Sequence, residues 1–148
     1  MKQYLFTFVL LLVTIILLLA FPARSLQFFR VSGNSMEPSL KDGQRILVRM
    51  ARGTNSDFRH NDIVLLLHPE TNRLAVKRIV ATPLQSIETL DQLDIPLENA
   101  LRLHTRLPLG YYAVLGDNVA KSQDSRHFGL IHEDAIRGRV IGIRQWGK

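Results

Sequence analysis

The residues of this chain best suited to chemistry are a serine and a lysine that lie far apart in the sequence. Ser35 stands between Asn34 and Met36 in the polar stretch RVSGNSMEPSLKDGQRILVRM. A serine hydroxyl acts as a nucleophile only when a base takes its proton and hydrogen-bond donors stabilise the oxyanion. A backbone N–H in a tight loop supplies one donor, and Gly33 permits such a loop. Taken alone, a serine in this setting usually makes only turn hydrogen bonds.

Lys77 is the candidate base. The segment RLAVKRIV has the pattern of a strand, in which Lys77 shares a face with Ala75 and Ile79. Burial among apolar neighbours lowers the pKa of a lysine, and a neutral amine near pH 7 can act as a general base. From this segment alone, a solvated lysine on an edge strand is the stronger interpretation.

Histidine with an aspartate behind it is the usual alternative base. The histidines stand in no recognisable triad context, and none forms the H-E-x-x-H pattern of a zinc site. We interpret each as an ordinary surface or loop residue: His60, His68, His104, His127 and His132. The absence of cysteine excludes disulfides, thiolate metal sites and a cysteine nucleophile.

A third segment, GDNVAKSQDSRHFGLI at residues 116–131, is dense in hydrogen-bonding side chains. Asp124 and Arg126 are close enough in sequence to pair with each other or to hold other loops. Ser122 is able to exchange a hydrogen bond with a nearby amine. A polar turn tied together by its own side chains explains the same composition.

Short strands must position these groups. Five segments have the length and apolar pattern of strands, and the second and third suit the two arms of a hairpin. They are residues 44–50, 62–67, 73–80, 111–115 and 137–146. Residues 86–99 are acidic and interrupted by Pro96, which indicates a solvated excursion with room for a helical turn. The soluble part is therefore predicted to be a small, mainly β domain.

Residues 4–21 form an uncharged apolar run. As a helix it would extend roughly 27 Å, enough for the hydrocarbon core of a bilayer. A cleaved signal peptide is the alternative, but cutting after Ala20 or Ala23 leaves a large residue at −3. We expect an uncleaved anchor. Its orientation is open, because Lys2 and Arg24 flank opposite ends.

The net charge of +6 and the pI near 10.2 are typical of proteins that bind nucleic acid or an anionic membrane surface. The basic residues are scattered and form no nucleic-acid-binding signature. Beside an apolar anchor, the phospholipid membrane is the favoured partner and nucleic acid is not expected, although simple solubility also explains the charge.

Four motifs make the interpretation specific. SGNSMEPSL, NDIV, AVKRIV and GDN-x-x-x-S-x-D-S-R-x-F-G follow the apolar run in that order. Together they resemble the type I signal peptidase family, serine peptidases with a Ser–Lys dyad. The resemblance extends from about Val31 to Val140, apart from a weakly matching stretch at residues 82–110.

The resemblance implies a role for each matching residue. Ser35 would be the nucleophile and Lys77 the general base, with Ser122 orienting the lysine. Asp124 and Arg126 would form a supporting ion pair. Further supporting positions, around the dyad or beside the nucleophile, are Gly116, Asp117, Asn118, Met36 and Gly33.

The resemblance also implies a fold and a setting. We expect a mainly β, signal-peptidase-like catalytic domain over residues 25–148 and one N-terminal transmembrane helix over residues 1–24. Its substrates would be preproteins with small residues at −3 and −1, bound extended. No metal or organic cofactor is implied, and no oligomeric state is predicted. The implied location is the bacterial cytoplasmic membrane, with the catalytic domain on the extracytoplasmic face.

Two departures from the family pattern are visible. Some members place a serine oxyanion donor two residues before the nucleophile, where this chain has Gly33. Ser32 is one residue out of register, so the sequence assigns it no role and leaves the second donor open. The usual Gly-Asp before the apolar strand is Asn61-Asp62, and the short segment before the last motif leaves room only for a minimal accessory domain.

Three other kinds of protein share part of this pattern. A dedicated peptidase of the same family would mature one propeptide, such as that of a nickel superoxide dismutase or a conjugation protein. A membrane-anchored binding protein would keep the fold without catalysis. Self-cleaving repressors share a Ser–Lys dyad but lack the anchor and the last motif.

Overall fold

The structure is a computed structural model that describes residues 2–20, 26–51, 57–96 and 105–144. Seven strands form one antiparallel sheet with strand order β1-β2-β7-β3-β4-β5-β6. The strands are β1 (Leu26–Arg30), β2 (Arg45–Met50), β3 (Ile63–Leu67), β4 (Leu74–Ala81), β5 (Tyr111–Leu115), β6 (Ile131–His132) and β7 (Ile136–Arg144). The predicted mainly β class is confirmed.

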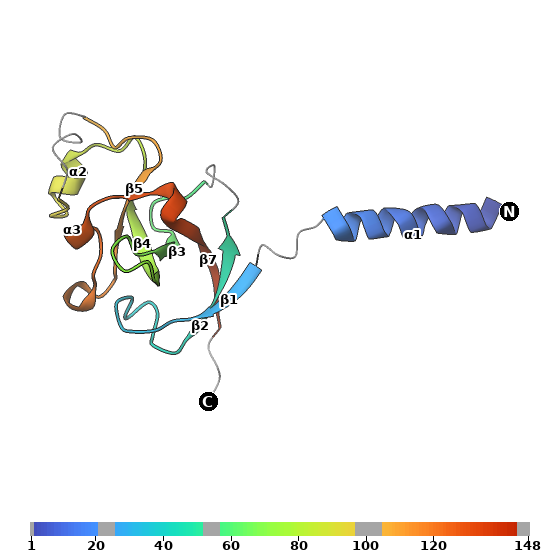
Figure 1. Cartoon of the computed structure of the whole chain (residues 1–148), viewed down its shortest axis with the longest axis horizontal. Helices are drawn as coiled ribbons and strands as arrows, with labels where there is room; N and C mark the ends of the chain where they lie inside the picture. The colour runs from blue at the N-terminus through green and yellow to red at the C-terminus, as the bar shows by residue number, and fades with distance from the viewer. Residues whose placement is uncertain (1, 21–25, 52–56, 97–104, 145–148) are drawn as a thin grey trace.

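Helices are few and short apart from the first. They are α1 (Lys2–Ala20), α2 (Glu88–Asp91), η3 (Val119–Lys121), α3 (Ser125–Phe128) and η4 (Glu133–Ala135). Figure 1 shows α1 standing apart from the curled sheet, while α2 and α3 lie against the end of the sheet that holds β4 and β5.

All five predicted strands are present, and the predicted hairpin is β3 paired with β4. In β2 the alternation is as expected, since Ile46 and Val48 are fully buried. The end of the fifth segment, residues 145 and 146, lies outside the described residues. The structure adds β1 and β6, which the apolar pattern did not indicate.

Separate apolar clusters pack on the two faces of β3. Val64 and Leu66 of β3 pack in one cluster with residues from β4, β5 and β7, whereas Leu65 packs in a second cluster with β1, β2 and the loop between them. Because β3 is buried on both faces, its sequence is a continuous apolar run rather than an alternation. The hairpin therefore anchors both halves of the domain.

The prediction for the acidic segment after β4 was partly wrong. Its described acidic side chains are exposed, as expected, but Leu90 and Ile95 are buried in a third apolar cluster with Ile87, Leu107 and Ala113. The segment is therefore a small packed lobe carrying one helical turn, α2, rather than a purely solvated excursion. The apolar residues were too few and too irregularly spaced to reveal this packing.

The described side chains of α1 are almost all apolar and exposed, from Tyr4 to Ile16. Within the residues described in full, no helix reaches the length and hydropathy required of a membrane span. The predicted boundary at residues 24 and 25 lies outside the described residues, so the two-part domain division stays a prediction.

Candidate active site

Lys77 lies in the middle of β4, directly opposite Val64 of β3. Its side chain is only 3% exposed and projects from the same face as the buried Ile79. The face predicted from the alternation is confirmed, and the alternative of a solvated edge-strand lysine is wrong. The sequence around Lys77 did not show that β4 lies between β3 and β5 in the sheet.

The partner of the Lys77 amine is Ser122. Lys77 Nζ donates a hydrogen bond of 2.8 Å to Ser122 Oγ, and Ser122 is 4% exposed. Burial lowers the pKa of Lys77. The negative charge of Asp124 opposes this effect, and the positive charge of Arg126 adds to it. The site therefore favours the neutral amine more than water does.

Asp124 joins the parts of this site. Its carboxylate accepts hydrogen bonds from the Gly116 N–H at 2.9 Å and from Arg126 Nε and Nη2 at 2.9 and 2.7 Å. Burial would raise the pKa of Asp124, but the bonds from Arg126, Gly116 and Ser122 lower it to about 2. Asp124 also caps the N-terminus of α3. The predicted pairing of Asp124 with Arg126 is present.

Ser35 occupies the loop between β1 and β2, and its backbone lies against the segment that contains Gly116 and Asn118. The Asn118 N–H donates to the Ser35 carbonyl at 3.0 Å. A Cβ placed on Gly116 would lie 2.2 Å from Ser122 Oγ and 2.6 Å from the Ser35 carbonyl oxygen. Glycine at position 116 thus lets the Ser35 loop and the partner of Lys77 approach one another.

The two residues of the expected dyad are brought to one site but are not joined directly. In the part of the chain that the structure describes, no hydrogen bond connects the Ser35 hydroxyl with the Lys77 amine. Their link runs through Ser122 and Gly116. Met36, which follows the serine, is 1% exposed and fixes the loop in the apolar cluster beside β1 and β2.

Arg78 makes supporting contacts beside the site that the sequence reasoning missed. Its Nε and Nη2 bind the two oxygens of Asp117 at 2.8 and 2.7 Å, and Nη2 also donates to Ser39 Oγ at 3.2 Å. Its Nη1 donates to the Asn61 carbonyl at 3.1 Å. Neighbouring residues of a strand point to opposite faces, so Arg78 must point away from the face that carries Lys77. The Lys-Arg pair in the AVKRIV motif was the sequence feature that could have indicated a separate role for Arg78. Arg78 ties the loop that carries Ser35 to the strand that carries Lys77.

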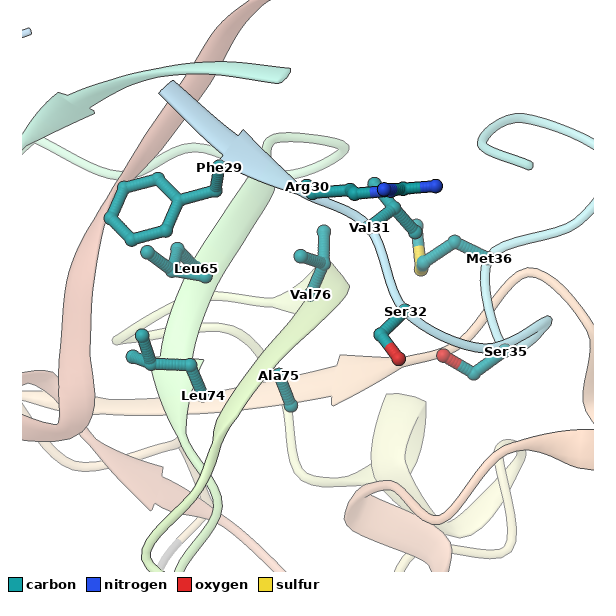
Figure 2. Close-up of a pocket in the computed structure, with 10 residues that line it drawn as sticks. All are labelled: Phe29, Arg30, Val31, Ser32, Ser35, Met36, Leu65, Leu74, Ala75 and Val76. Atoms are coloured by element: carbon teal, nitrogen blue, oxygen red, sulfur yellow. The ribbon is translucent and has the colours of Figure 1, made fainter. Parts of the chain in front are cut away.

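A pocket of about 230 Å³ opens beside Ser35 (Figure 2). It lies between the end of β1 and the beginning of β4, strands that are not neighbours in the sheet, so the sheet must curl to bring them together. The lining residues are Phe29, Arg30, Val31, Ser32, Ser35, Met36, Leu65, Leu74, Ala75 and Val76. Most are apolar, which suits an apolar peptide segment more than a charged ligand.

Two strand edges bear on this pocket. Within the described residues, β1 pairs only with β2, and β5 joins β4 only from Arg78 onward. The first half of β4 therefore leaves its second edge without a partner strand in that part of the structure.

Among the described residues, no three acidic or histidine side chains are grouped so that they could hold a metal ion.

The chain is similar in sequence to known proteins. A family model described as "Signal peptidase, peptidase S26" matches residues 1–96 and 94–144. Signal peptidase IB of Staphylococcus aureus (strain COL) is 31% identical over 150 residues, covering 80% of this chain and 76% of the relative. Signal peptidase I U of Bacillus subtilis (strain 168) is 33% identical over 161 residues, covering 93% of this chain and 86% of the relative.

Proposed function

Because the chain belongs to the signal peptidase family, peptidase S26, it is a serine peptidase, and we propose that it removes N-terminal signal peptides with a Ser35–Lys77 dyad. The observation that supports the dyad most strongly is the buried Lys77 amine, held by Ser122 in a site whose wall includes the Ser35 backbone. A lysine in that position has no structural ion pair of its own among the described residues and suits a proton acceptor.

The proposed reaction proceeds through an acyl-enzyme. Neutral Lys77 takes the proton of the Ser35 hydroxyl as Oγ attacks the scissile carbonyl carbon, and the carbonyl electron pair moves to the oxygen. The tetrahedral intermediate collapses, the C–N bond breaks, and the proton passes to the departing amine. Lys77 then takes a proton from the water that attacks the ester carbonyl, and returns it to Ser35 Oγ as the bond between Oγ and the acyl carbon breaks. Ser122 keeps the amine in place through both steps.

The pocket supports a preprotein substrate bound in an extended form. In the described part of the chain, β1 and the first half of β4 each have one edge without a partner strand, and these edges offer backbone groups to an added strand. The mostly apolar lining beside Ser35 suits uncharged side chains, and the family resemblance implies that those at −1 and −3 are small. The names of the relatives, Signal peptidase IB and I U, agree with this class of substrate.

We also propose that the chain is anchored in the bacterial cytoplasmic membrane by α1, with the catalytic domain outside the cytoplasm. Two observations support this. The apolar side chains of α1 are exposed, and Leu26 and Phe28 on β1, which follows it, are 46% and 61% exposed. Protease digestion of intact spheroplasts tests the orientation: the β domain should be cut, and its complete protection would overturn the proposal.

The function is tested by incubating the full chain in detergent with secretory precursors that carry Ala-x-Ala before the cleavage site. Native protein should release the mature N-terminus, whereas Ser35→Ala and Lys77→Ala should be inactive. Equal cleavage by all three proteins would remove the dyad from consideration. Cleavage of one precursor alone in a broad panel would identify a dedicated maturation peptidase instead.

A further inference from the structure

We propose that the Ser32 hydroxyl is the side-chain donor of the oxyanion site. This inference rests on the proposed function, because it concerns the transition state of the Ser35 reaction. An attacked carbonyl requires donors aimed at the oxygen that gains charge, and one backbone N–H is usually joined by a second group. The Ser35 site therefore requires a second donor beside the nucleophile.

Ser32 is the hydroxyl that the fold places beside the nucleophile. Both serines line the same pocket, and Figure 2 shows their hydroxyl oxygens pointing toward one another. Ser32 is exposed, so its hydroxyl is open to an incoming peptide. Of the remaining lining side chains, only Arg30 carries a hydrogen-bond donor, and its guanidinium lies beside Gly43, where a Cβ would meet Arg30 Nη2 at 3.3 Å.

The turn at Gly33 accounts for this arrangement. Its φ of +88° lies in the region that favours glycine, and its N–H donates to Asp42 Oδ1 at 2.8 Å. The reversal of the chain turns Ser32 toward the same side of the loop as Ser35. Glycine has no side-chain donor, so Ser32 takes the place that a hydroxyl at position 33 would otherwise fill.

Both proposed donors are available. Within the described residues, no hydrogen bond engages the Ser32 hydroxyl, and the Ser35 N–H has no backbone acceptor. When Ser35 Oγ bonds to the carbonyl carbon, the electron pair moves to oxygen and the nucleophile's proton goes to Lys77. Ser32 keeps its own proton and donates a hydrogen bond to the oxyanion, together with the Ser35 N–H.

The test compares Ser32→Ala, Ser32→Thr and Ser86→Ala, with Ser35→Ala as the inactive reference. Ser86 is another exposed serine, remote from the pocket, and its loss should change nothing. Removal of one oxyanion donor lowers kcat by about 10²-fold to 10³-fold. We expect Ser32→Ala to show such a loss with KM nearly unchanged, and Ser32→Thr to retain most of the activity because it keeps the hydroxyl.

A transition-state analogue separates this role from a structural one. A peptide aldehyde forms a hemiacetal with Ser35 whose oxygen occupies the oxyanion site, so Ser32→Ala should weaken its binding by the same factor as kcat. The thermal unfolding midpoint should not move. Unchanged kcat, or a rise in KM with kcat intact, would overturn the role of Ser32 while leaving the dyad standing. Full activity of Ser35→Ala would overturn the proposed function itself.

Discussion

Lys77 Nζ donates its hydrogen bond to Ser122 Oγ at a distance of 2.8 Å, and both side chains are almost fully buried. A hydroxyl is a neutral partner, so it orients the amine without holding a proton on it as a contacting carboxylate would. The negative charge that raises the pKa of Lys77, that of Asp124, is itself paired with Arg126. This arrangement orients the base and makes it less readily protonated than a lysine in water.

Replacing Ser122 by alanine should impair catalysis more than folding. Lys77 would lose its hydrogen-bond partner, and its flexible side chain would leave the reactive orientation. We expect a fall in kcat of roughly 10-fold to 10²-fold with little change in KM, in line with a misplaced general base. Steady-state kinetics on a precursor peptide measure this effect.

Ser125→Ala is the matched control for Ser122→Ala. Ser125 is equally buried, but its hydroxyl accepts from the Val114 N–H rather than from Lys77. Its loss should lower stability by about 1 kcal/mol and leave kcat of the folded protein near the native value. A comparable loss of kcat in both variants would mean that Ser122 acts only through folding.

The rate should rise with pH through the lowered pKa of Lys77. Only the neutral amine accepts the Ser35 proton, so activity is lost at pH values below the pKa of Lys77 and reaches a plateau above it. Arg126→Gln should move the profile to higher pH, because the positive charge of Arg126 helps lower the pKa of Lys77. Profiles of kcat/KM measure both effects, and a rate that is flat from pH 5 to 9 would speak against Lys77 as the base.

Gly116→Ala should abolish activity. The new Cβ would overlap the Ser122 hydroxyl and the Ser35 carbonyl, which is backbone and cannot move aside cheaply. Either the serine loop or the lysine partner would be displaced, and we expect a loss of more than about 10²-fold in kcat/KM. Gly142→Ala is the control, since its Cβ would meet Leu47 at an ordinary 3.6 Å. Near-native activity of Gly116→Ala would show that this close approach is dispensable.

Asp124 should make stability depend on pH in the acid range. Its folded pKa of about 2 lies below the ordinary value of 3.8, so its contribution is present above pH 4 and is lost as pH falls through 2. The contribution is on the order of 2 kcal/mol. Asp124→Asn should flatten this dependence and, by leaving Arg126 without its partner, destabilise the protein by about 3 kcal/mol at pH 7. Urea unfolding at several pH values measures both, and an unaltered acid slope would exclude Asp124 as its source.

Much of the sheet was predictable because its strands follow local rules. Apolar positions alternate with largely polar ones in β2, which indicates that one face of the strand is buried. β3 is continuously apolar, which indicates that both of its faces are buried. β1 escaped prediction because Leu26 and Phe28 are exposed and because, among the described residues, the strand pairs only with β2. β6 has two residues, too few for any periodicity.

Site residues that belong to a sequence motif could be predicted. Residues that join the site only through tertiary contacts could not. Ser35, Lys77 and Ser122 were found through their motifs, yet their proximity depends on the curl of the sheet and on Gly116. The bonds of Arg78 to Asp117 and Ser39 join positions about 39 residues apart, which no local pattern reveals. The face of Lys77 was correct from alternation, but its burial required knowledge of the neighbouring strands.

The central claim is that Lys77 activates Ser35 to form an acyl-enzyme. The most direct measurement is acid quenching during turnover of a peptide ester, followed by mass spectrometry of the fragment that contains Ser35. Native protein should carry the acyl group on Ser35, and accumulation should be faster at high pH. Ser35→Ala and Lys77→Ala should carry none. An acyl group on Ser35 formed at the native rate in Lys77→Ala, or found on another residue in the native protein, would contradict the dyad.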